Sequence, residues 1–378
     1  MTQITPFTIE TSEQELNDLK QRLVMTRWPD KETPTDWSQG IPLSYMIEIH
    51  DYWLNQYDWQ ARLELLNQWP GFKTKIDGLG IHFLHIKSAE PDALPLLMTH
   101  GWPGSIVEFQ KIIGPLTNPT QHGGLASDAF DLVIPTLPGF GYSDKPVSPG
   151  WNIDKIATAW DELMVRLGYD RYVAQGGDWG SIVTAQIGVQ NLGHCIGIHM
   201  NMPIAPPDPN NMDNLTDQET DALKSMQFYQ DNDSGYSKQQ STRPQTLGYG
   251  LADSPIGQAA WILEKFYQWM DCNGHPENIA SRDELLDNVM MYWLPDAGAS
   301  SARIYWESFG STNLEPIEIP VGCTLFPKEI FKTSERWARA RFTDLIHFEV
   351  MEKGGHFAAF EQPHALVEQI RACFRQLR

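Results

Sequence analysis

Apolar positions along the chain follow two spacings, one typical of strands and one typical of helices. Short apolar runs predict strands at 81–86, 94–98, 130–137, 172–175, 195–202, 319–326 and 347–351. Apolar residues at helical spacing predict helices at 16–24, 43–67, 153–167, 181–189, 257–270 and 364–377. This alternation is typical of a mostly parallel sheet covered by helices. Residues 206–250 break the rhythm with Pro, Asn, Asp, Gln and Gly, which indicates an insertion.

The composition provides ample apolar surface for a folded core and a strongly acidic charge. Hydrophobic residues make up 41% of the chain, and the formal net charge is −20 with a pI near 4.9. Such a charge repels nucleic acid and anionic lipid surfaces, so neither is expected as a partner. No stretch approaches the roughly 20 apolar residues of a membrane helix, and residues 1–30 hold no apolar run like a signal peptide. We therefore expect a cytoplasmic protein.

The cysteines indicate neither a metal site nor a redox motif. All four are scattered along the chain without a Cys-x-x-Cys pair: Cys195, Cys272, Cys323 and Cys373. Buried free thiols are the expected state, because free Cys is among the residues most often buried. No metal and no cofactor are expected.

A tight strand-to-helix turn carries the first candidate for chemistry. Gly176-Gly177-Asp178-Trp179-Gly180 joins the strand at 172–175 to the helix at 181–189. Its Gly-x-Asp-x-Gly spacing matches the turn that carries the nucleophile of an α/β hydrolase, with Asp in place of Ser. Glycines are needed there because side chains would collide with the neighbouring strand and helix. The motif predicts the α/β-hydrolase fold and Asp178 as nucleophile, although an Asp that only caps the helix also fits.

A second loop supplies candidate hydrogen-bond donors to this nucleophile. His100-Gly101-Trp102-Pro103-Gly104 follows the strand at 94–98 and is expected to place a backbone N–H beside Asp178. The N–H groups of Trp102 and Trp179 are then predicted to form an oxyanion hole. His100 itself is expected to be structural, with its ring bonded to a nearby backbone group.

The base and its acid are predicted from the last two strands. His356, in Gly354-Gly355-His356-Phe357, follows the last strand, where the histidine of an α/β hydrolase lies. The acid should follow the preceding strand, which ends at Phe326-Pro327-Lys328-Glu329. Glu329 is the first candidate, although an exposed loop Glu also fits. Asp208, after the strand at 195–202, is the second candidate.

Together these motifs resemble the microsomal-type epoxide hydrolases, a branch that includes the insect juvenile hormone epoxide hydrolases. The likeness covers nearly the whole chain. It is carried by the motifs above and by Pro6-Phe7, Arg27-Trp28-Pro29-Asp30, Gly139-Phe140-Gly141-Tyr142-Ser143, Ser234-Gly235-Tyr236, Asp253-Ser254-Pro255, Ile262-Leu263-Glu264-Lys265-Phe266 and Ala358-Ala359-Phe360. The chain departs from the mammalian members at its start, where we expect no membrane anchor.

The resemblance implies four segments: an N-terminal extension at 1–75, the first part of the core at 76–203, an inserted lid at 204–312 and the second part of the core at 313–378. It implies an enzyme that adds water to an epoxide and releases a vicinal diol. Asp178 then forms an ester with the substrate, and water activated by His356 with Glu329 hydrolyses it. No cofactor takes part, and a homo-oligomer is compatible with the sequence.

The lid is expected to bind the epoxide oxygen and an apolar substrate. The resemblance implies that Tyr236 and Tyr305 bind this oxygen and, with Trp102 and Trp179, contact the substrate. Tyr305 lies in a looser match, Arg303-Ile304-Tyr305-Trp306-Glu307, so a role in packing alone stays open. An apolar or aryl substrate is also suggested by aromatic residues of the lid: Trp261, Phe266, Trp269, Trp293 and Trp306.

Two other functions stay open. A haloalkane dehalogenase uses the same Asp and His steps, but it needs N–H donors for the halide where an epoxide needs acidic hydroxyls. The lid tyrosines favour the epoxide. A non-catalytic protein that binds a small molecule in a hydrolase pocket is the other alternative. Diol formation, halide release and ligand-induced stabilisation distinguish the three.

Overall fold

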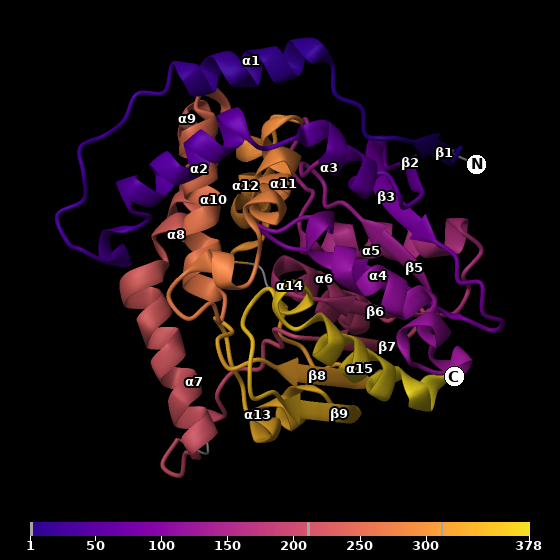
Figure 1. Ribbon diagram of the computed structural model, residues 1–378. Helices are drawn as coiled ribbons and strands as arrows, with labels where there is room; N and C mark the ends of the chain where they lie inside the picture. The colour runs from indigo at the N-terminus through magenta and orange to yellow at the C-terminus, as the bar shows by residue number, and fades with distance from the viewer. Residues whose placement is uncertain (1–2, 210–211, 311–312) are drawn as a thin grey trace.

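The computed structural model describes residues 3–209, 212–310 and 313–378. Within these residues nine strands form one sheet, in the order β1-β2-β3-β5-β4-β6-β7-β8-β9 (Figure 1). Neighbours from β5 to β9 are parallel, whereas β1, β2 and β3 pair antiparallel. The predicted mostly parallel sheet is confirmed. The strands are β1 Thr5–Phe7, β2 Gly71–Ile76, β3 Leu79–Ile86, β4 Leu94–Thr99, β5 Phe130–Pro135, β6 Tyr172–Gly176, β7 Cys195–Met200, β8 Val321–Leu325 and β9 Leu345–Val350.

The sequence pattern does not predict the first two strands, which extend the sheet beyond β3. β1 is only three residues long, and Lys73 and Lys75 interrupt the apolar pattern of β2. Their pairing depends on the register that places Phe7 opposite Gly71. A Cβ at Gly71 would lie 2.6 Å from the carbonyl oxygen of Phe7, so glycine permits this close approach. The N-terminal segment therefore contributes strands to the same sheet as the core.

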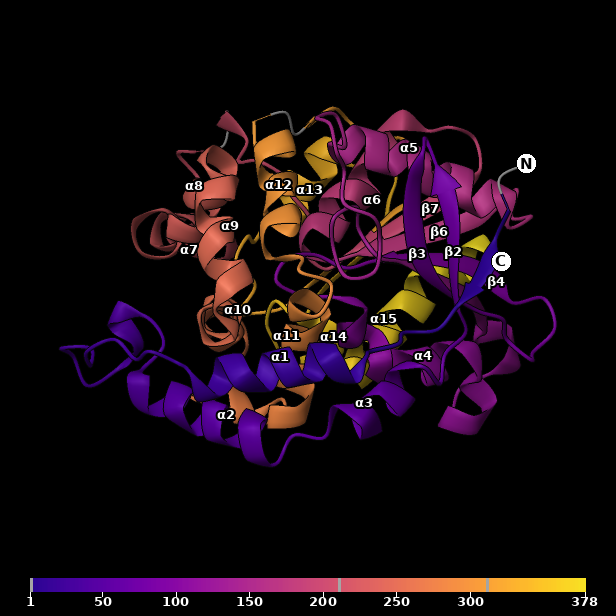
Figure 2. The same cartoon turned by 90° about the horizontal axis from the view of Figure 1, so that it is seen from above.

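Helices cover both faces of the sheet, as Figure 2 shows. On one face α5 packs against α6, which contacts β6 and β7; on the other α4 packs against α15, which contacts β7, β8 and β9. The core helices are α4 Gln110–Thr117, α5 Ile153–Arg166, α6 Asp178–Gln190, α13 Glu335–Arg341, α14 Ala358–Glu361 and α15 Pro363–Phe374. Single 3₁₀ turns lie at Trp37–Gln39, Ile106–Phe109, Pro119–His122, Ala126–Asp128, Pro276–Asn278 and Arg375–Leu377.

The chain between β7 and β8 forms a separate group of helices beside the sheet (Figure 1). The helices are α7 Asp217–Phe228, α8 Gly235–Thr242, α9 Pro244–Asp253, α10 Pro255–Trp269, α11 Arg282–Trp293 and α12 Gly298–Ser308, with a π-helical turn at Tyr229–Asp233. We call these helices the insertion. α7 is rich in polar residues, so apolar spacing does not predict it, but Thr216 and Glu219 form a capping box at its start. The expected end of the lid at 312 lies outside the described residues.

Three N-terminal helices run along the insertion (Figure 2): α1 Glu13–Val24, α2 Leu43–Asn55 and α3 Trp59–Leu66. The helical stretch expected at 43–67 is divided, because the side chain of Asp58 caps α3 by accepting from the N–H groups of Gln60 and Ala61. Arg62 on α3 donates through Nε and Nη2 to Asp287 on α11, at 3.0 and 2.6 Å. This ion pair joins the N-terminal segment to the insertion.

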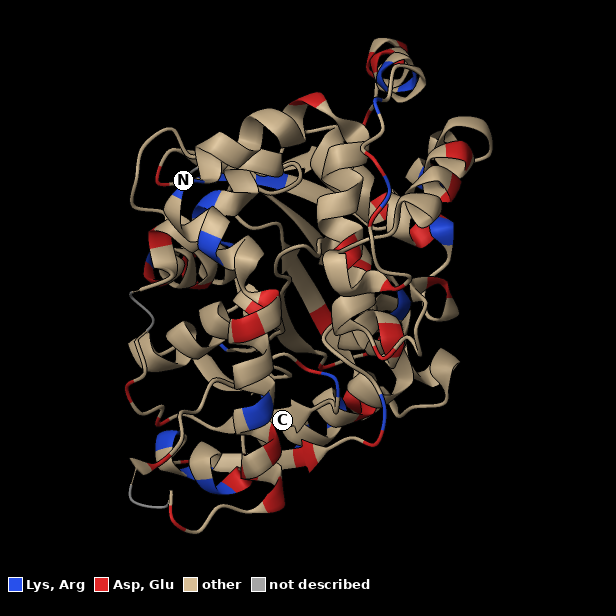
Figure 3. Cartoon of the chain, turned by 90° about the vertical axis from the view of Figure 1, so that its left-hand side faces the viewer, with Lys and Arg blue, Asp and Glu red and all other residues tan. Residues whose placement is uncertain are grey.

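Charges of both signs are spread over the surface that carries the insertion. Figure 3 shows Lys and Arg interspersed with Asp and Glu on this side, without a continuous basic area. Among the described residues, none of the helices is long and apolar enough to cross a membrane. The four cysteines are buried and free, as expected.

Candidate active site

Asp178 lies at the tight turn between β6 and α6, with a backbone φ of 52°. Both flanking glycines are sterically required. A Cβ at Gly176 would collide with the carbonyl oxygen of Gly180, and a Cβ at Gly180 would collide with that of Thr99 at the end of β4. The turn thus presents Asp178 at the carboxyl edge of the sheet, where ligands of α/β proteins bind.

The side chain of Asp178 is bound by the loop after β4 rather than by its own helix. The backbone N–H of Trp102 donates to its Oδ1 at 2.7 Å. Gly101 has no room for a side chain, because a Cβ there would collide with the same carboxylate. Trp179 follows Asp178 in the first turn of α6, where N–H groups lack helical partners.

His100 is structural, as expected. Its Nδ1 lies 3.0 Å from the carbonyl oxygen of Gly101, and its Nε2 accepts from the N–H of Leu137 at 3.2 Å. Burial lowers the pKa of His100 to about 4, so the ring is neutral at pH 7. It therefore holds the loop that carries Trp102.

An extension of the β8–β9 pairing brings His356 and Glu329 together. Lys328 and Gly355 form an isolated parallel bridge beyond the two strands. Glu329 Oε1 lies 2.6 Å from His356 Nδ1, and the other ring nitrogen, Nε2, lies 3.2 Å from Asp178 Oδ2. The structure therefore places Glu329, the first of the two candidate acids, against the histidine.

Two carboxylates set the protonation of His356. Burial alone would lower its pKa, but the charges of Glu329 and Asp178 more than reverse this effect and raise the pKa well above the usual range. The protonated imidazole is therefore favoured in the free enzyme. Loss of the Asp178 charge, as in an ester, removes one of the two stabilising anions and favours the neutral base.

Two tyrosines of the insertion lie over the nucleophile. Tyr236 on α8 stacks on Trp102 with ring centroids 5.0 Å apart, and Tyr305 on α12 meets Trp179 edge to face at 4.8 Å. Both are buried, and burial, with a contribution from the Asp178 charge, raises the pKa of each hydroxyl well above 10. They therefore remain protonated donors at neutral pH.

Tyr229 is a third tyrosine of the site, and the motifs did not indicate it. Its hydroxyl lies 3.3 Å from that of Tyr236 and 2.9 Å from Oγ of Ser237. Tyr229 belongs to the π-helical turn that precedes α8. Its spacing of seven residues from Tyr236, about two helical turns, is the sequence signal that could have found it.

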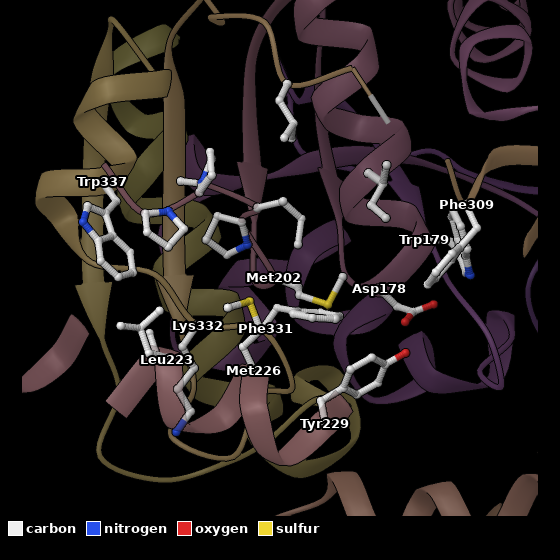
Figure 4. Close-up of a pocket in the computed structure, with 18 of the residues that line it drawn as sticks. Asp178, Trp179, Met202, Leu223, Met226, Tyr229, Phe309, Phe331, Lys332 and Trp337 are labelled. Carbon is white, nitrogen blue, oxygen red and sulfur yellow. The ribbon is translucent and has the colours of Figure 1, made fainter. Parts of the chain in front are cut away.

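A cavity of about 380 Å³ opens from Asp178 between the core and the insertion (Figure 4). It runs from Asp178 and Tyr229 at one end to Trp337 at the other. Apart from Asp178, the tyrosines and Lys332, its lining is apolar and includes Trp179, Ile182, Met202, Ile204, Leu223, Met226, Phe309, Leu314, Phe331 and Trp337. The pocket is therefore suited to an apolar small molecule.

The aromatic lid residues proposed from the sequence do not line this cavity. The indole of Trp269 donates to Asp233, Phe266 stacks on Phe357, and the indole of Trp261 donates to Gln240. Trp306 is 52% exposed. Trp261, Phe266 and Trp269 therefore contact other side chains of the protein instead of the cavity. The apolar lining of the cavity comes from segments that meet only in the folded chain.

The fold and the geometry around Asp178 define a hydrolase of the α/β-hydrolase class. The family model for the epoxide hydrolase N terminus matches residues 4–109, and that for the alpha/beta hydrolase fold matches residues 95–246. The chain is 52% identical to a Stigmatella aurantiaca protein named "Putative epoxide hydrolase", over 99% of this chain and 86% of that one.

Two further relatives are also named epoxide hydrolases. The chain is 36% identical to epoxide hydrolase 1 of Sus scrofa, over 97% of this chain and 88% of the relative. The crystal structure of the juvenile hormone epoxide hydrolase of Bombyx mori superimposes with a TM-score of 0.90 at 31% identity, over 100% of this chain and 96% of that one. The chain therefore belongs to the epoxide hydrolase family, as the resemblance implied.

Proposed function

We propose that this protein opens apolar epoxides to vicinal diols through a covalent ester on Asp178. The arrangement of the Asp178 carboxylate carries this proposal. One oxygen accepts from the Trp102 amide, the other lies 3.2 Å from His356 Nε2, and Asp178 lines the large cavity. A carboxylate held in this way can act first as a nucleophile and then as the acyl group of an ester.

In the first step, Asp178 attacks an epoxide carbon while the carbon–oxygen bond of the ring breaks. The leaving oxygen is a poor alkoxide, so an acid must protonate it. Tyr236 and Tyr305 supply that proton from the lid side of the cavity. Serine would fail at position 178, because its ether to the substrate could not be hydrolysed.

In the second step, water attacks the carbonyl carbon of the Asp178 ester and gives a proton to His356 Nε2. The amides of Trp102 and Trp179 stabilise the oxyanion, and Glu329 stabilises the imidazolium. The ester bond then breaks, and His356 returns the proton to the departing alkoxide. The proton left on the Asp178 carboxyl replaces the one that the tyrosine gave, so epoxide plus water yields diol.

The lid chemistry favours this reaction over haloalkane dehalogenation. Phenol hydroxyls suit a developing alkoxide, and Tyr229, Tyr236 and Tyr305 line the cavity. Halide release from haloalkanes, together with no diol formation from epoxides, would reverse this assignment. Ligand-induced stabilisation without either product would instead indicate a binding protein.

His356→Gln tests the covalent step. Asp178 can still attack, but no base activates water, so the ester should accumulate. The mass of the intact protein should rise by one substrate mass, located in the peptide that contains Asp178. Unmodified protein after exposure to a reactive epoxide would contradict the proposal.

Heavy-oxygen water separates the ester from direct attack by water. In a single turnover with enzyme in excess, the first diol should receive its new oxygen from Asp178 and remain unlabelled. Solvent oxygen should enter the Asp178 peptide instead. Label in the diol with none on the peptide would mean that water attacks the epoxide directly.

The division into segments at 1–75, 76–203, 204–312 and 313–378 is part of this proposal, with the insertion acting as the lid. We also propose a cytoplasmic location, because four buried, unpaired thiols suit a reducing compartment. Limited proteolysis and cell fractionation would test these assignments.

A further inference from the structure

A buried ion pair lies beside one of the two lid tyrosines. Lys265 on α10 binds Asp233, the last residue of the π-helical turn, with 2.6 Å between Nζ and Oδ1. Both side chains are only 7% exposed. The other carboxylate oxygen of Asp233 accepts from the indole of Trp269 at 2.6 Å. Both oxygens of Asp233 are thus occupied, and they fix the ammonium group inside the insertion.

The ammonium group of Lys265 faces the ring of Tyr236. Its Nζ lies 4.8 Å from the centroid of this ring. Tyr236 is buried and stacks on Trp102, so little water screens the charge of Lys265 from the phenol. Aromatic rings surround Tyr305 instead, because its ring meets those of Trp102 and Trp179 edge to face. The two lid tyrosines therefore lie in different electrostatic surroundings.

Stability alone does not explain a charge pair at this place. Taking two charges out of water offsets much of their attraction, and apolar residues of the same volume often stabilise a fold equally well. Glu264 adds a second carboxylate 2.7 Å from Lys265 Nζ, and burial raises the pKa of that carboxyl. The position of Lys265 over the Tyr236 ring points instead to a role in the reaction.

A nearby cation helps Tyr236 because its other surroundings weaken it as an acid. Burial raises the pKa of its hydroxyl, and the charge of Asp178 acts in the same direction. Such a phenol gives its proton slowly, since proton transfer is most efficient from an acid whose pKa lies near the working pH. Negative charge develops on the phenol as its O–H bond breaks, and a fixed cation stabilises that charge.

We propose that Lys265 is a positioning residue of the first step, and that Tyr236 rather than Tyr305 gives the proton to the epoxide oxygen. The inference rests on the proposed ester mechanism. As the carbon–oxygen bond of the ring breaks, the O–H bond of Tyr236 breaks and a new O–H bond forms on the leaving oxygen. Lys265 stabilises the electron pair left on the phenol until ester hydrolysis returns a proton. Tyr305 contributes a hydrogen bond and keeps its own proton.

This placement predicts that Lys265 affects the first step alone. Lys265→Met removes the ammonium group and keeps an unbranched apolar chain in its place. Alkylation of Asp178 should slow roughly tenfold, a size typical of a desolvated cation over an aromatic ring. Hydrolysis of the ester should keep its rate, because attack by water does not use the acidity of Tyr236.

Lys155→Met is the matched control. Lys155 Nζ lies 4.6 Å from the centroid of the Trp151 ring and 3.3 Å from Asp77 Oδ2, so this lysine also combines a ring contact with an ion pair. All three residues lie outside the set of described residues that line the large cavity. Both steps should therefore run at the wild-type rate in this variant.

A double-mutant cycle separates the proposed role of Lys265 from a structural one. Single-turnover alkylation is measured on the full-length enzyme by rapid acid quench and mass spectrometry of the ester, with styrene oxide as probe. Lys265→Met should slow alkylation in the Tyr305→Phe background as much as in the wild type. It should have no further effect in the Tyr236→Phe background, because the proton donor on which it acts is absent. A structural defect would slow alkylation in all three backgrounds.

A second variant, Asp233→Asn with Lys265→Met, avoids a buried carboxylate without its cation and so protects the test against a failure to fold. Asn can still accept from the Trp269 indole, and alkylation should again slow roughly tenfold, only while Tyr236 is present. Wild-type alkylation in either folded variant, or equal slowing in the Tyr236→Phe background, would overturn the role of Lys265. Failure of the ester mechanism itself would be distinguishable, because no ester would then form in the wild type or in His356→Gln.

Discussion

Replacing Glu329 by Gln removes a negative charge from beside His356 while keeping the shape of the side chain. The two side chains are only 1% and 2% exposed, and Glu329 Oε1 lies 2.6 Å from Nδ1. A hydrogen bond to a charged group contributes about 1.5–3 kcal/mol, against about 0.5–1.5 for a neutral pair. The imidazolium that forms as water attacks should therefore lose about 1–2 kcal/mol of stabilisation. Ester hydrolysis should slow roughly 5- to 30-fold.

The assay follows formation and loss of the Asp178 ester by rapid quench and mass spectrometry. Alkylation should change little, because Glu329 lies on the far side of the imidazole from Asp178. Glu335→Gln, at a side chain that is 50% exposed, serves as control and should leave both steps unchanged. Hydrolysis within twofold of the wild type in Glu329→Gln would show that the charge does not stabilise the imidazolium. Equal slowing of alkylation would point to a displaced loop.

Three further predictions concern the lid tyrosines, the pKa of His356 and the ion pair between Glu219 and Arg336. Replacing both Tyr236 and Tyr305 by Phe should nearly abolish alkylation, since a general acid contributes roughly 10² to 10⁴ in rate. Each single replacement should leave part of this rate. Unchanged single-turnover alkylation in the double variant would rule out the pair. Asp178→Asn should lower the pKa of His356, because it removes one of the two anions that raise it; an imidazole NMR titration measures this, and an unchanged pKa contradicts it. Glu219, whose pKa is lowered to about 2 chiefly by a hydrogen bond from Arg336, should stabilise the fold above its ordinary pKa near 4.5 and lose this contribution as the pH falls toward 2. Urea unfolding should therefore find Glu219→Gln less stable by about 1.5–3 kcal/mol at pH 7 and nearly equal to the wild type near pH 2; equal stability at pH 7 would refute this.

Local steric rules explain why the sequence alone determined the type of fold and the order of the main site residues. A nucleophile turn needs glycines on both sides of Asp178, because the backbone of Gly180 and Thr99 leaves no space for side chains. The apolar runs of buried parallel strands, and the place of His356 after the last strand, are also local signals. These features leave short motifs or apolar runs in the sequence, so they can be recognised without the tertiary structure.

Contacts between segments that are distant in sequence decided which acid meets His356 and which residues line the cavity. Glu329 rather than Asp208 reaches His356, because the Lys328–Gly355 bridge extends the register of β8 and β9. The lining of the large cavity depends on which faces of separate elements meet. Periodicity says that a residue is buried, but it does not say which partner it faces or whether a cavity lies between them. That choice belongs to the packing of the whole chain, and only the tertiary structure contains it.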